Sequence, residues 1–189
     1  MLQLADEELM AQYQQGDLAA FDVLYQRYAD RIYAYLLRLS GDRERAAELF
    51  QETFLHLHSQ RCRYNPEKPF GAWIFRIARN LAYNQSRQAK RYDNLFKGSA
   101  DIETLADGQG KDAAETLHTD FLHQQVETAL SSLSEEQREV ILLSYHGGLK
   151  YADIARVMGT TEDAIKQRMR RGMVLLRERL KAFLRSDAE

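Results

Sequence analysis

The chain has 189 residues and a formal net charge of -2; 44% of its residues are hydrophobic and 29% are charged. This composition supplies enough apolar side chains for compact cores, which excludes a wholly disordered protein. The longest apolar runs are short, such as residues 140–143, which excludes a membrane-spanning helix. The N-terminus is acidic and lacks an apolar segment, so we expect no secretion signal and a cytosolic protein with no membrane contact.

Few residues suit a metal site or a catalytic centre. The one cysteine, Cys62, excludes an internal disulfide and a Cys-rich zinc site. His56 and His58 lie near it, but a spacing of two puts the two histidines on different faces of a helix. The chain also lacks a Gly-rich phosphate loop and a nucleophile motif. We therefore predict no metal, no cofactor and no enzymatic activity.

The small net charge conceals blocks of opposite sign. Residues 1–60 carry a net charge of -5, residues 61–92 carry +7, residues 93–137 carry -8 and residues 138–189 carry +4. Two basic segments separated by an acidic one could contact a polyanion at two places. Solvated helix faces are the alternative explanation of any one block.

The first part of the chain is predicted to form four helices. Apolar residues recur every three or four positions over residues 5–15, 17–39, 43–60 and 70–91, as amphipathic helices require. Asp42 is the expected N-cap of the third helix. Pro66 and Pro69 demand a loop between the third and the fourth. These helices form the first predicted domain, residues 1–92.

A glycine-containing acidic segment, residues 93–114, is predicted to be a flexible linker to a second domain, residues 115–189. In that domain one helix ends near Leu133, and Ser134 begins the next with a capping-box pattern. A short helix over 151–158, a turn at Gly159 and a long helix capped by Thr160 or Thr161 then form a helix-turn-helix. The predicted fold class is all-α, with two helical domains.

The last helix is rich in bases, and in this arrangement a second helix lies in the DNA major groove. Lys166, Gln167 and Arg170 are best placed to donate to base edges or phosphates, and Arg171 or Tyr151 would steady the DNA backbone. The full set of residues predicted to face DNA is Tyr151, Thr161, Glu162, Asp163, Lys166, Gln167, Arg170 and Arg171. A helical hairpin with a solvated basic face is the alternative.

The run from Leu133 to Leu180 closely resembles the C-terminal DNA-binding domain of extracytoplasmic-function sigma factors, group 4 of the sigma-70 family. Residues 50–54 and 70–80 are similar to the polymerase-binding and minus-ten promoter segments of that family. The resemblance implies a dissociable specificity subunit of bacterial RNA polymerase. Its partners would be core RNA polymerase, through the clamp helices and the flap, and promoter DNA, with residues 1–92 reading the minus-ten element and residues 115–189 the minus-thirty-five element.

The resemblance also assigns two sets of residues in the first domain. The predicted polymerase-binding residues are Glu48, Leu49, Phe50, Gln51, Glu52 and Thr53. The predicted minus-ten residues are Arg61, Arg63, Tyr64, Arg76, Arg79, Asn80, Tyr83, Asn84 and Arg87. Aromatic faces and cations are the groups that hold single-stranded DNA.

The chain departs from the family in its polymerase-binding helix. Family members usually carry Asp-Ala-Glu-Asp where this chain has residues 46–49, Ala-Ala-Glu-Leu, so two carboxylates are missing. Positions 46, 49 and 53 share one helix face. We therefore hypothesise that a Ser/Thr kinase phosphorylates Thr53 and restores negative charge there. The alternative is that Glu48, Glu52 and apolar contacts suffice; an anti-sigma factor is the other regulatory partner expected.

One other class of function remains open. A helix-turn-helix transcriptional regulator that is not a polymerase subunit would bind duplex operator DNA by itself. A sigma factor would bind promoter DNA specifically only together with polymerase.

Overall fold

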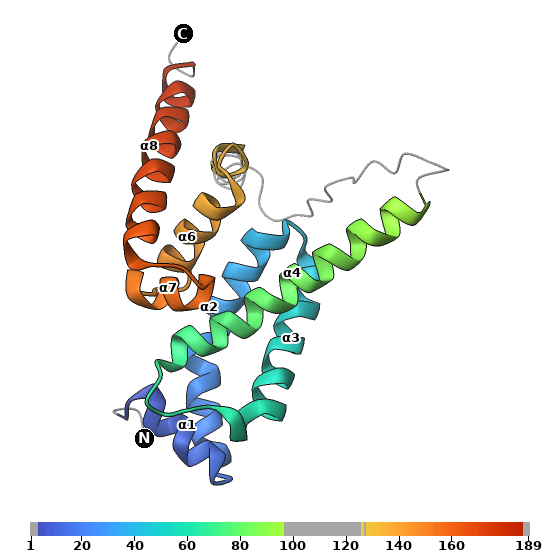
Figure 1. The fold of residues 1–189 in the computed structure, drawn as a ribbon, viewed down its shortest axis with the longest axis vertical. Coiled ribbons are helices and arrows are strands. Elements are labelled where there is room, and N and C mark those ends of the chain that lie inside the picture. The colour runs from blue at the N-terminus through green and yellow to red at the C-terminus, as the bar shows by residue number, and fades with distance from the viewer. Residues whose placement is uncertain (1–3, 97–125, 127, 187–189) are drawn as a thin grey trace, which may run out of the picture.

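The computed structural model describes residues 4–96, 126 and 128–186 (Figure 1). This part of the chain is helical and contains no strand, which confirms the all-α prediction. Its elements are α1 (Asp6–Gln14), α2 (Leu18–Ser40), α3 (Arg43–Gln60), the 3-10 turn η1 (Arg61–Arg63), α4 (Phe70–Phe96), α6 (Glu135–Tyr145), α7 (Tyr151–Met158) and α8 (Glu162–Ser186). No helix within these limits is long and apolar enough to cross a bilayer.

The helix ends follow local capping chemistry. The Asp42 carboxylate accepts a hydrogen bond from the N–H of Arg45 at 2.7 Å, which satisfies a free donor at the start of α3. Ser134 and Gln137 form the reciprocal capping box predicted for α6. Gly159 ends α7 in the left-handed conformation, with a φ of 67°. These features confirm the predicted helix boundaries at those positions.

Helix α4 is longer than predicted. It continues to Phe96, whereas the sequence pattern placed its end near Arg91. The first residues of the predicted linker, 93–96, therefore belong to this helix. The rest of that linker, residues 97–114, lies outside the described residues.

The first four helices enclose a core rich in aromatic side chains. Ile32, Tyr35 and Leu36 are fully buried on one face of α2, as its period of three and four requires. The ring of Tyr35 meets the edge of Phe75 on α4 at 5.5 Å between centroids. Such edge-to-face pairs add stability beyond the area they bury. Helix α4 is thereby fixed against α2.

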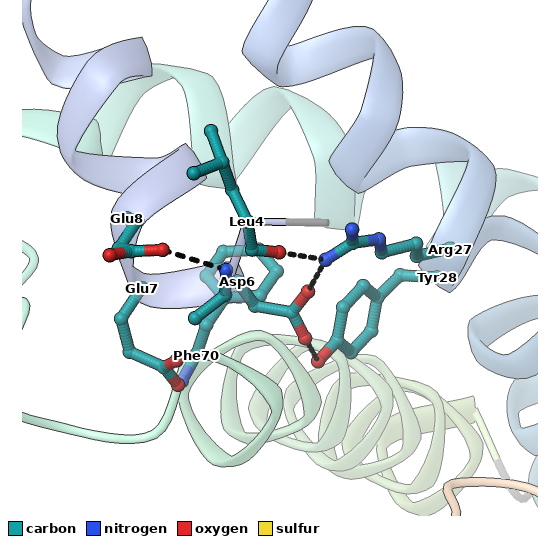
Figure 2. Close-up of polar contacts among 8 residues, drawn as sticks. Leu4, Asp6, Glu7, Glu8, Arg27, Tyr28 and Phe70 are labelled. Atoms are coloured by element: carbon teal, nitrogen blue, oxygen red, sulfur yellow. Dashed lines mark hydrogen bonds and ion pairs between the residues drawn. The ribbon is translucent and has the colours of Figure 1, made fainter. Parts of the chain in front are cut away.

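A polar network at the N-terminus fixes the start of α4 (Figure 2). The Asp6 carboxylate accepts hydrogen bonds from Arg27 and from the hydroxyl of Tyr28, each at 2.5 Å. Burial, followed by the bond to Asp6, raises the pKa of Tyr28. The neighbouring Glu7 accepts a bond from the N–H of Phe70, the first residue of α4, at 2.9 Å. Helix α1 therefore joins α2 to the N-terminal end of α4.

The C-terminal helices form a second core. Residues 140–143 of α6 are buried, together with Ile154 on α7 and with Ile165 and Met169 on α8. Gly172 allows α8 to approach α6 closely, because a Cβ there would lie 3.0 Å from the side chain of Ile141. The compact helix-turn-helix of α7 and α8 thus rests on α6.

The two cores are in contact with each other. Helix α6 packs against α2, and α7 packs against α4. Figure 1 shows α7 beside the N-terminal half of α4. We refer below to residues 4–96 as the N-terminal unit and to residues 126 and 128–186 as the C-terminal unit.

Helix α3 has one face in the core and one in solvent. Ala46, Leu49 and Thr53 are buried, whereas Glu48 and Gln51 are exposed. The Thr53 hydroxyl donates to the carbonyl of Leu49 at 2.7 Å, so its hydrogen bond is satisfied inside the helix.

Replacing Thr53 with a charged residue should destabilise the fold. We expect Thr53→Glu to lower the free energy of unfolding by about 3 kcal/mol or more, because the carboxylate would be buried without a partner. Urea denaturation followed by circular dichroism measures the change. The matched control is Gln51→Glu, which places the same group on the exposed face and should change stability by no more than about 0.5 kcal/mol. Equal stability of the two variants would contradict the burial of Thr53.

Candidate functional site

The face of α8 predicted to read DNA is open to solvent. Glu162, Asp163, Lys166, Gln167, Arg170 and Arg171 are all exposed. The Thr161 hydroxyl, also exposed, caps the helix by accepting from the N–H of Ala164 at 3.2 Å. Ile165 and Met169 point to the opposite side and are buried. Packing therefore holds this helix by one face and leaves the polar face free.

The charges on this face are not equally available. Lys166 pairs with Glu162 at 3.0 Å and with Asp163 at 3.5 Å, and its hydrogen bond to Glu162 is the main reason that the pKa of Lys166 is raised. Arg170 and Arg171 form no ion pair within the part of the chain that the structure describes. These two arginines are the cations that can bind phosphate without first leaving a carboxylate.

Two other residues of the helix-turn-helix, Arg168 and Tyr151, differ in their exposure. Arg168 points inward and binds Glu136 of α6, with its Nε 2.9 Å from the carboxylate. Tyr151, at the start of α7, is exposed. The guanidinium of Arg168 therefore holds α8 to α6, although Arg168 lies in the sequence between Gln167 and Arg170 of the exposed face.

On α3, the exposed stripe consists of Glu48, Gln51, Glu52 and Leu55. Leu55, which the sequence reasoning missed, is 67% exposed. Its signal in the sequence was its position three residues after Glu52 and four after Gln51, on the same helix face. The stripe combines two carboxylates with one apolar side chain.

The other predicted polymerase-binding residues lie beneath this stripe. Phe50 is half-buried and packs with Phe54 at 5.0 Å and with Tyr25 at 6.1 Å between ring centroids. Leu49 is buried in the core. Of the six residues predicted on α3, Glu48, Gln51 and Glu52 are exposed.

The hypothesis of phosphorylation at Thr53 is wrong for this fold. The side chain of Thr53 is 0% exposed and its hydroxyl is bonded to the Leu49 carbonyl. A kinase could not reach it, and a phosphate would place about two negative charges among apolar side chains. Positions 46, 49 and 53 do share a face, but that face is the buried one.

The three candidate residues in the segment after α3 differ in their exposure to solvent. Arg63 is exposed, whereas Arg61 donates to the carbonyl of His58 at 2.8 Å and is partly buried. Tyr64 is 4% exposed, because its ring packs against Phe70 at 5.9 Å and Trp73 at 5.0 Å. Tyr64 is therefore a core residue, and the prediction that its ring stacks on a base is wrong in this conformation.

Helix α4 presents a polar stripe along its length. Arg76, Asn80, Asn84 and Arg87 are exposed and follow one another at intervals of four, four and three residues, which places them on one face. This face carries two cations and two amides. Such groups bind the backbone and base edges of nucleic acid.

Arg79 and Tyr83 point to a different side of α4, toward the C-terminal unit. Arg79 contacts Glu139 of α6 at 2.5 Å through Nε and at 3.2 Å through its terminal nitrogen. The hydroxyls of Tyr83 and Tyr35 donate to the same carboxylate at 3.2 Å and 3.4 Å. We call these four residues the Glu139 cluster.

Glu139 is 1% exposed, so the cluster holds a buried carboxylate. Burial, with the charge of Glu139 next, raises the pKa of Tyr83 to about 12 and that of Tyr35 well above its usual range. Both phenols are thus kept protonated as donors. For Arg79, burial lowers the pKa, but the hydrogen bond to Glu139 and the charges of Glu139 and the two tyrosines together raise it by more, so the guanidinium stays charged. The carboxylate has a fully formed set of partners.

No group of three or more His, Cys, Asp or Glu side chains suited to a metal ion occurs among the described residues. Cys62 is exposed and forms no disulfide.

Comparison with known proteins gives the same two units in the same order. Residues 24–92 match the family model of sigma-70 region 2, and residues 123–176 match that of sigma-70 region 4. The RNA polymerase sigma factor CarQ of Myxococcus xanthus is 30% identical over 171 residues, which cover 90% of this chain and 95% of CarQ. The ECF RNA polymerase sigma factor SigL of Mycobacterium tuberculosis is 32% identical over 168 residues, which cover 86% of this chain and 89% of SigL.

Two solved structures are similar over most of the chain. The sigma factor RpoE in complex with the anti-sigma factor NepR from Bartonella quintana has a TM-score of 0.70 at 28% identity, covering 85% of this chain and 96% of RpoE. CnrH in complex with the cytosolic domain of CnrY has a TM-score of 0.71 at 23% identity, covering 95% of this chain and 99% of CnrH, and supports the fold. By its sequence relatives and its two regions, the chain belongs to the extracytoplasmic-function sigma factors of the sigma-70 family.

Proposed function

We propose that this sigma factor binds core RNA polymerase and directs transcription initiation at promoters whose two elements are read by its two units. Residues 1–92 would act as region 2, residues 93–114 as the linker and residues 115–189 as region 4. The observation that carries the proposal is the exposed polar face of α8, held by a helix-turn-helix of the kind that docks in the major groove. The protein would act in the cytoplasm, without catalytic activity of its own.

Region 4 would bind the minus-thirty-five element as duplex DNA. Gln167 and Arg170 lie in the first turns of α8, which reach the base edges in this docking mode. Arg171 and Tyr151 would hold the phosphates, and Glu162 and Asp163 would accept from exposed base amino groups. Lys166 would exchange its carboxylate partners for DNA.

Region 2 would bind the melted minus-ten element along α4. The exposed stripe of Arg76, Asn80, Asn84 and Arg87 offers cations and amides to a single strand. Arg63, exposed in the turn before α4, would extend this surface, and Arg61 would border it. Arg79 and Tyr83 would join it only after leaving Glu139.

The stripe on α3 would bind core polymerase. Its carboxylates, Glu48 and Glu52, would pair with cations of the polymerase clamp, and Leu55 would add an apolar contact. Leu55 is 67% exposed and would supply part of the contact that the missing carboxylates do not. An anti-sigma factor would compete for these surfaces, as the likeness to RpoE, solved in complex with the anti-sigma factor NepR, suggests.

A transcriptional regulator that acts without joining polymerase is the alternative function. Run-off transcription with bacterial core polymerase on a promoter library separates the two. We expect transcripts only when this protein is added, from promoters that share two spaced elements. Specific binding of duplex DNA by the protein alone, with no transcripts, would contradict the proposal.

On a promoter recovered in that way, we expect Arg170→Ala to weaken holoenzyme binding by about 10- to 100-fold, the range for loss of a base or phosphate contact by arginine. Fluorescence anisotropy of a labelled promoter duplex measures this affinity. Arg168→Ala is the matched control, since the guanidinium of Arg168 binds Glu136 rather than solvent. If both variants bind promoter equally well, Arg170 does not contact DNA.

Reversing one charge on α3 should weaken the contact with polymerase. We expect Glu52→Lys to reduce affinity for core polymerase by about tenfold or more, because like charges across an interface repel. The control is Asp30→Lys, an equal charge change at an exposed position of α2. Surface plasmon resonance with immobilised core polymerase measures both. An unchanged affinity for Glu52→Lys would remove the α3 stripe from the polymerase interface.

A further inference from the structure

Helix α1 binds the main chain of the segment between α3 and α4. The side-chain amide nitrogen of Gln14, the last residue of α1, donates to the carbonyl of Arg61 at 2.8 Å and to the carbonyl of Tyr64 at 2.9 Å. Near the start of the same helix, the Glu7 carboxylate accepts from the N–H of Phe70 (Figure 2). All three partners are backbone groups, so α1 fixes the path of this segment.

The two contacts of Gln14 hold both ends of the turn η1. A side-chain amide has two N–H donors on a single nitrogen, and each donor here has its own acceptor. The two carbonyls lie on either side of Cys62 and Arg63. A carboxylate or an apolar side chain of similar length has no donor and could make neither bond.

Helix α1 is itself anchored, so it can serve as a fixed support. Leu9, Met10 and Tyr13 are buried in the first core. The Tyr13 hydroxyl lies 2.5 Å from Nδ1 of His58, in the last turn of α3. The guanidinium of Arg61 lies 6.0 Å from the centroid of the Tyr13 ring. Contacts from α1 therefore reach both the end of α3 and the turn that follows it.

The rest of the segment is ordered by its own hydrogen bonds. The N–H of Lys68 donates to the carbonyl of Asn65 at 2.9 Å, which closes a β-turn with Pro66 at its second position. The Tyr64 hydroxyl donates to the carbonyl of Lys68. Arg63 and Lys68 are exposed, so both cations project into solvent from a backbone that is held on either side.

We propose that Gln14 is a positioning residue for promoter recognition: by fixing the turn that carries Arg63, it determines which base Arg63 selects in the melted minus-ten element. The proposal rests on the proposed role of this surface in minus-ten binding. A planar guanidinium distinguishes bases only in a defined orientation, because its donors must match two acceptors at once. A cation on a loose segment still binds phosphate, which carries no sequence information. None of the residues that the sequence assigned to the minus-ten element lies on α1.

Promoter discrimination separates this role from a merely structural one. If Gln14 only stabilises the fold, its loss lowers the yield of transcript from all promoters alike. If Gln14 positions Arg63, its loss lowers the discrimination between bases at the minus-ten element. Discrimination at the minus-thirty-five element then stays as it was, because that element is read by α8.

The experiment uses the full-length protein with core polymerase on a promoter recovered by run-off transcription. Each position of the two promoter elements is changed in turn to the other three bases, and discrimination is the ratio of transcript yield from the best base to that from the worst. The test variants are Gln14→Met, which removes both donors, and Gln14→Glu, which replaces them by a carboxylate. The matched controls are Gln15→Met and Gln15→Glu, the same changes at the exposed neighbouring residue.

We expect the Gln14 variants to lose about tenfold in discrimination at one or more minus-ten positions, within the range for one base contact by arginine, and less than about twofold at the minus-thirty-five element. Arg63→Ala should lose discrimination at the same minus-ten positions. Combining Arg63→Ala with Gln14→Met should cause no further loss there, because both changes remove one interaction. Both Gln15 controls should match the parent.

Hydrogen–deuterium exchange of the protein alone measures the order of the segment independently of transcription. The N–H groups of Tyr64 and Lys68 are bonded within the segment, to the carbonyls of Arg61 and Asn65. We expect both to exchange about tenfold or more faster in the two Gln14 variants than in the parent and the controls. Circular dichroism shows that each variant is folded.

Unchanged exchange in both Gln14 variants would overturn the proposal, because Gln14 would then not fix the segment. Faster exchange with full minus-ten discrimination would overturn the role in base selection. Equal losses at the two promoter elements, full discrimination by Arg63→Ala, or a further loss in the combined variant would do the same. If the parent supports no transcription, the proposed function fails and the role in base selection fails with it, while the exchange rates still decide whether α1 fixes the segment.

Discussion

The burial of one carboxylate, that of Glu139, couples the two halves of this protein. A buried carboxylate without partners is destabilising by several kcal/mol, so it must be either paired or hydrated. Its partners, Arg79, Tyr83 and Tyr35, all lie across the junction from it. In a separated C-terminal unit the same side chain would lie on the surface of α6. The arrangement of the units and the burial of this one carboxylate are therefore linked.

The helices and their ends could be predicted from the sequence because their causes are local. Amphipathic spacing identifies the helices, and Asp42, Ser134 and Gly159 mark their ends within a few residues. The C-terminal end of α4 was predicted too early. No proline or glycine stands between Arg91 and Phe96, so loss of apolar spacing was the only signal, and it does not by itself stop a helix.

The candidate site was predictable in part, and the errors have a common origin. On α8 the polar face is uniform, so spacing alone placed Gln167 and Arg170 in solvent. On α3 the spacing correctly placed Thr53 on the same helix face as Ala46 and Leu49. Both of these residues are apolar, which by itself indicated that the face is buried. Tyr64 could be a stacking ring or a core ring, and only the packing of Phe70 and Trp73 around it decides.

The Glu139 cluster lay beyond sequence reasoning for another reason. Glu139 lies 56 to 104 residues from its three partners along the chain, and no spacing rule relates residues at that separation. The same holds for Arg31 and Arg138, each of which donates to a backbone carbonyl at a helix end of the other unit, because a backbone carbonyl as acceptor leaves no mark in the sequence. The acceptor of such a contact is a carbonyl made available by the end of a helix, and the side chains around it do not indicate its position.

The position of α4 in the chain also determines how tightly the units must hold each other. This helix ends at Phe96 and the description of the C-terminal unit begins at residue 126 of the same chain, so the two units are covalently joined. Covalent connection of two binding units can raise the effective concentration of one around the other to about 1 mM. Two units that bind each other with a dissociation constant of only about 10 μM would then be in contact in roughly 99% of molecules. Such a weak contact is sufficient inside one chain, and it would be lost if the same two units were expressed as separate proteins at micromolar concentration.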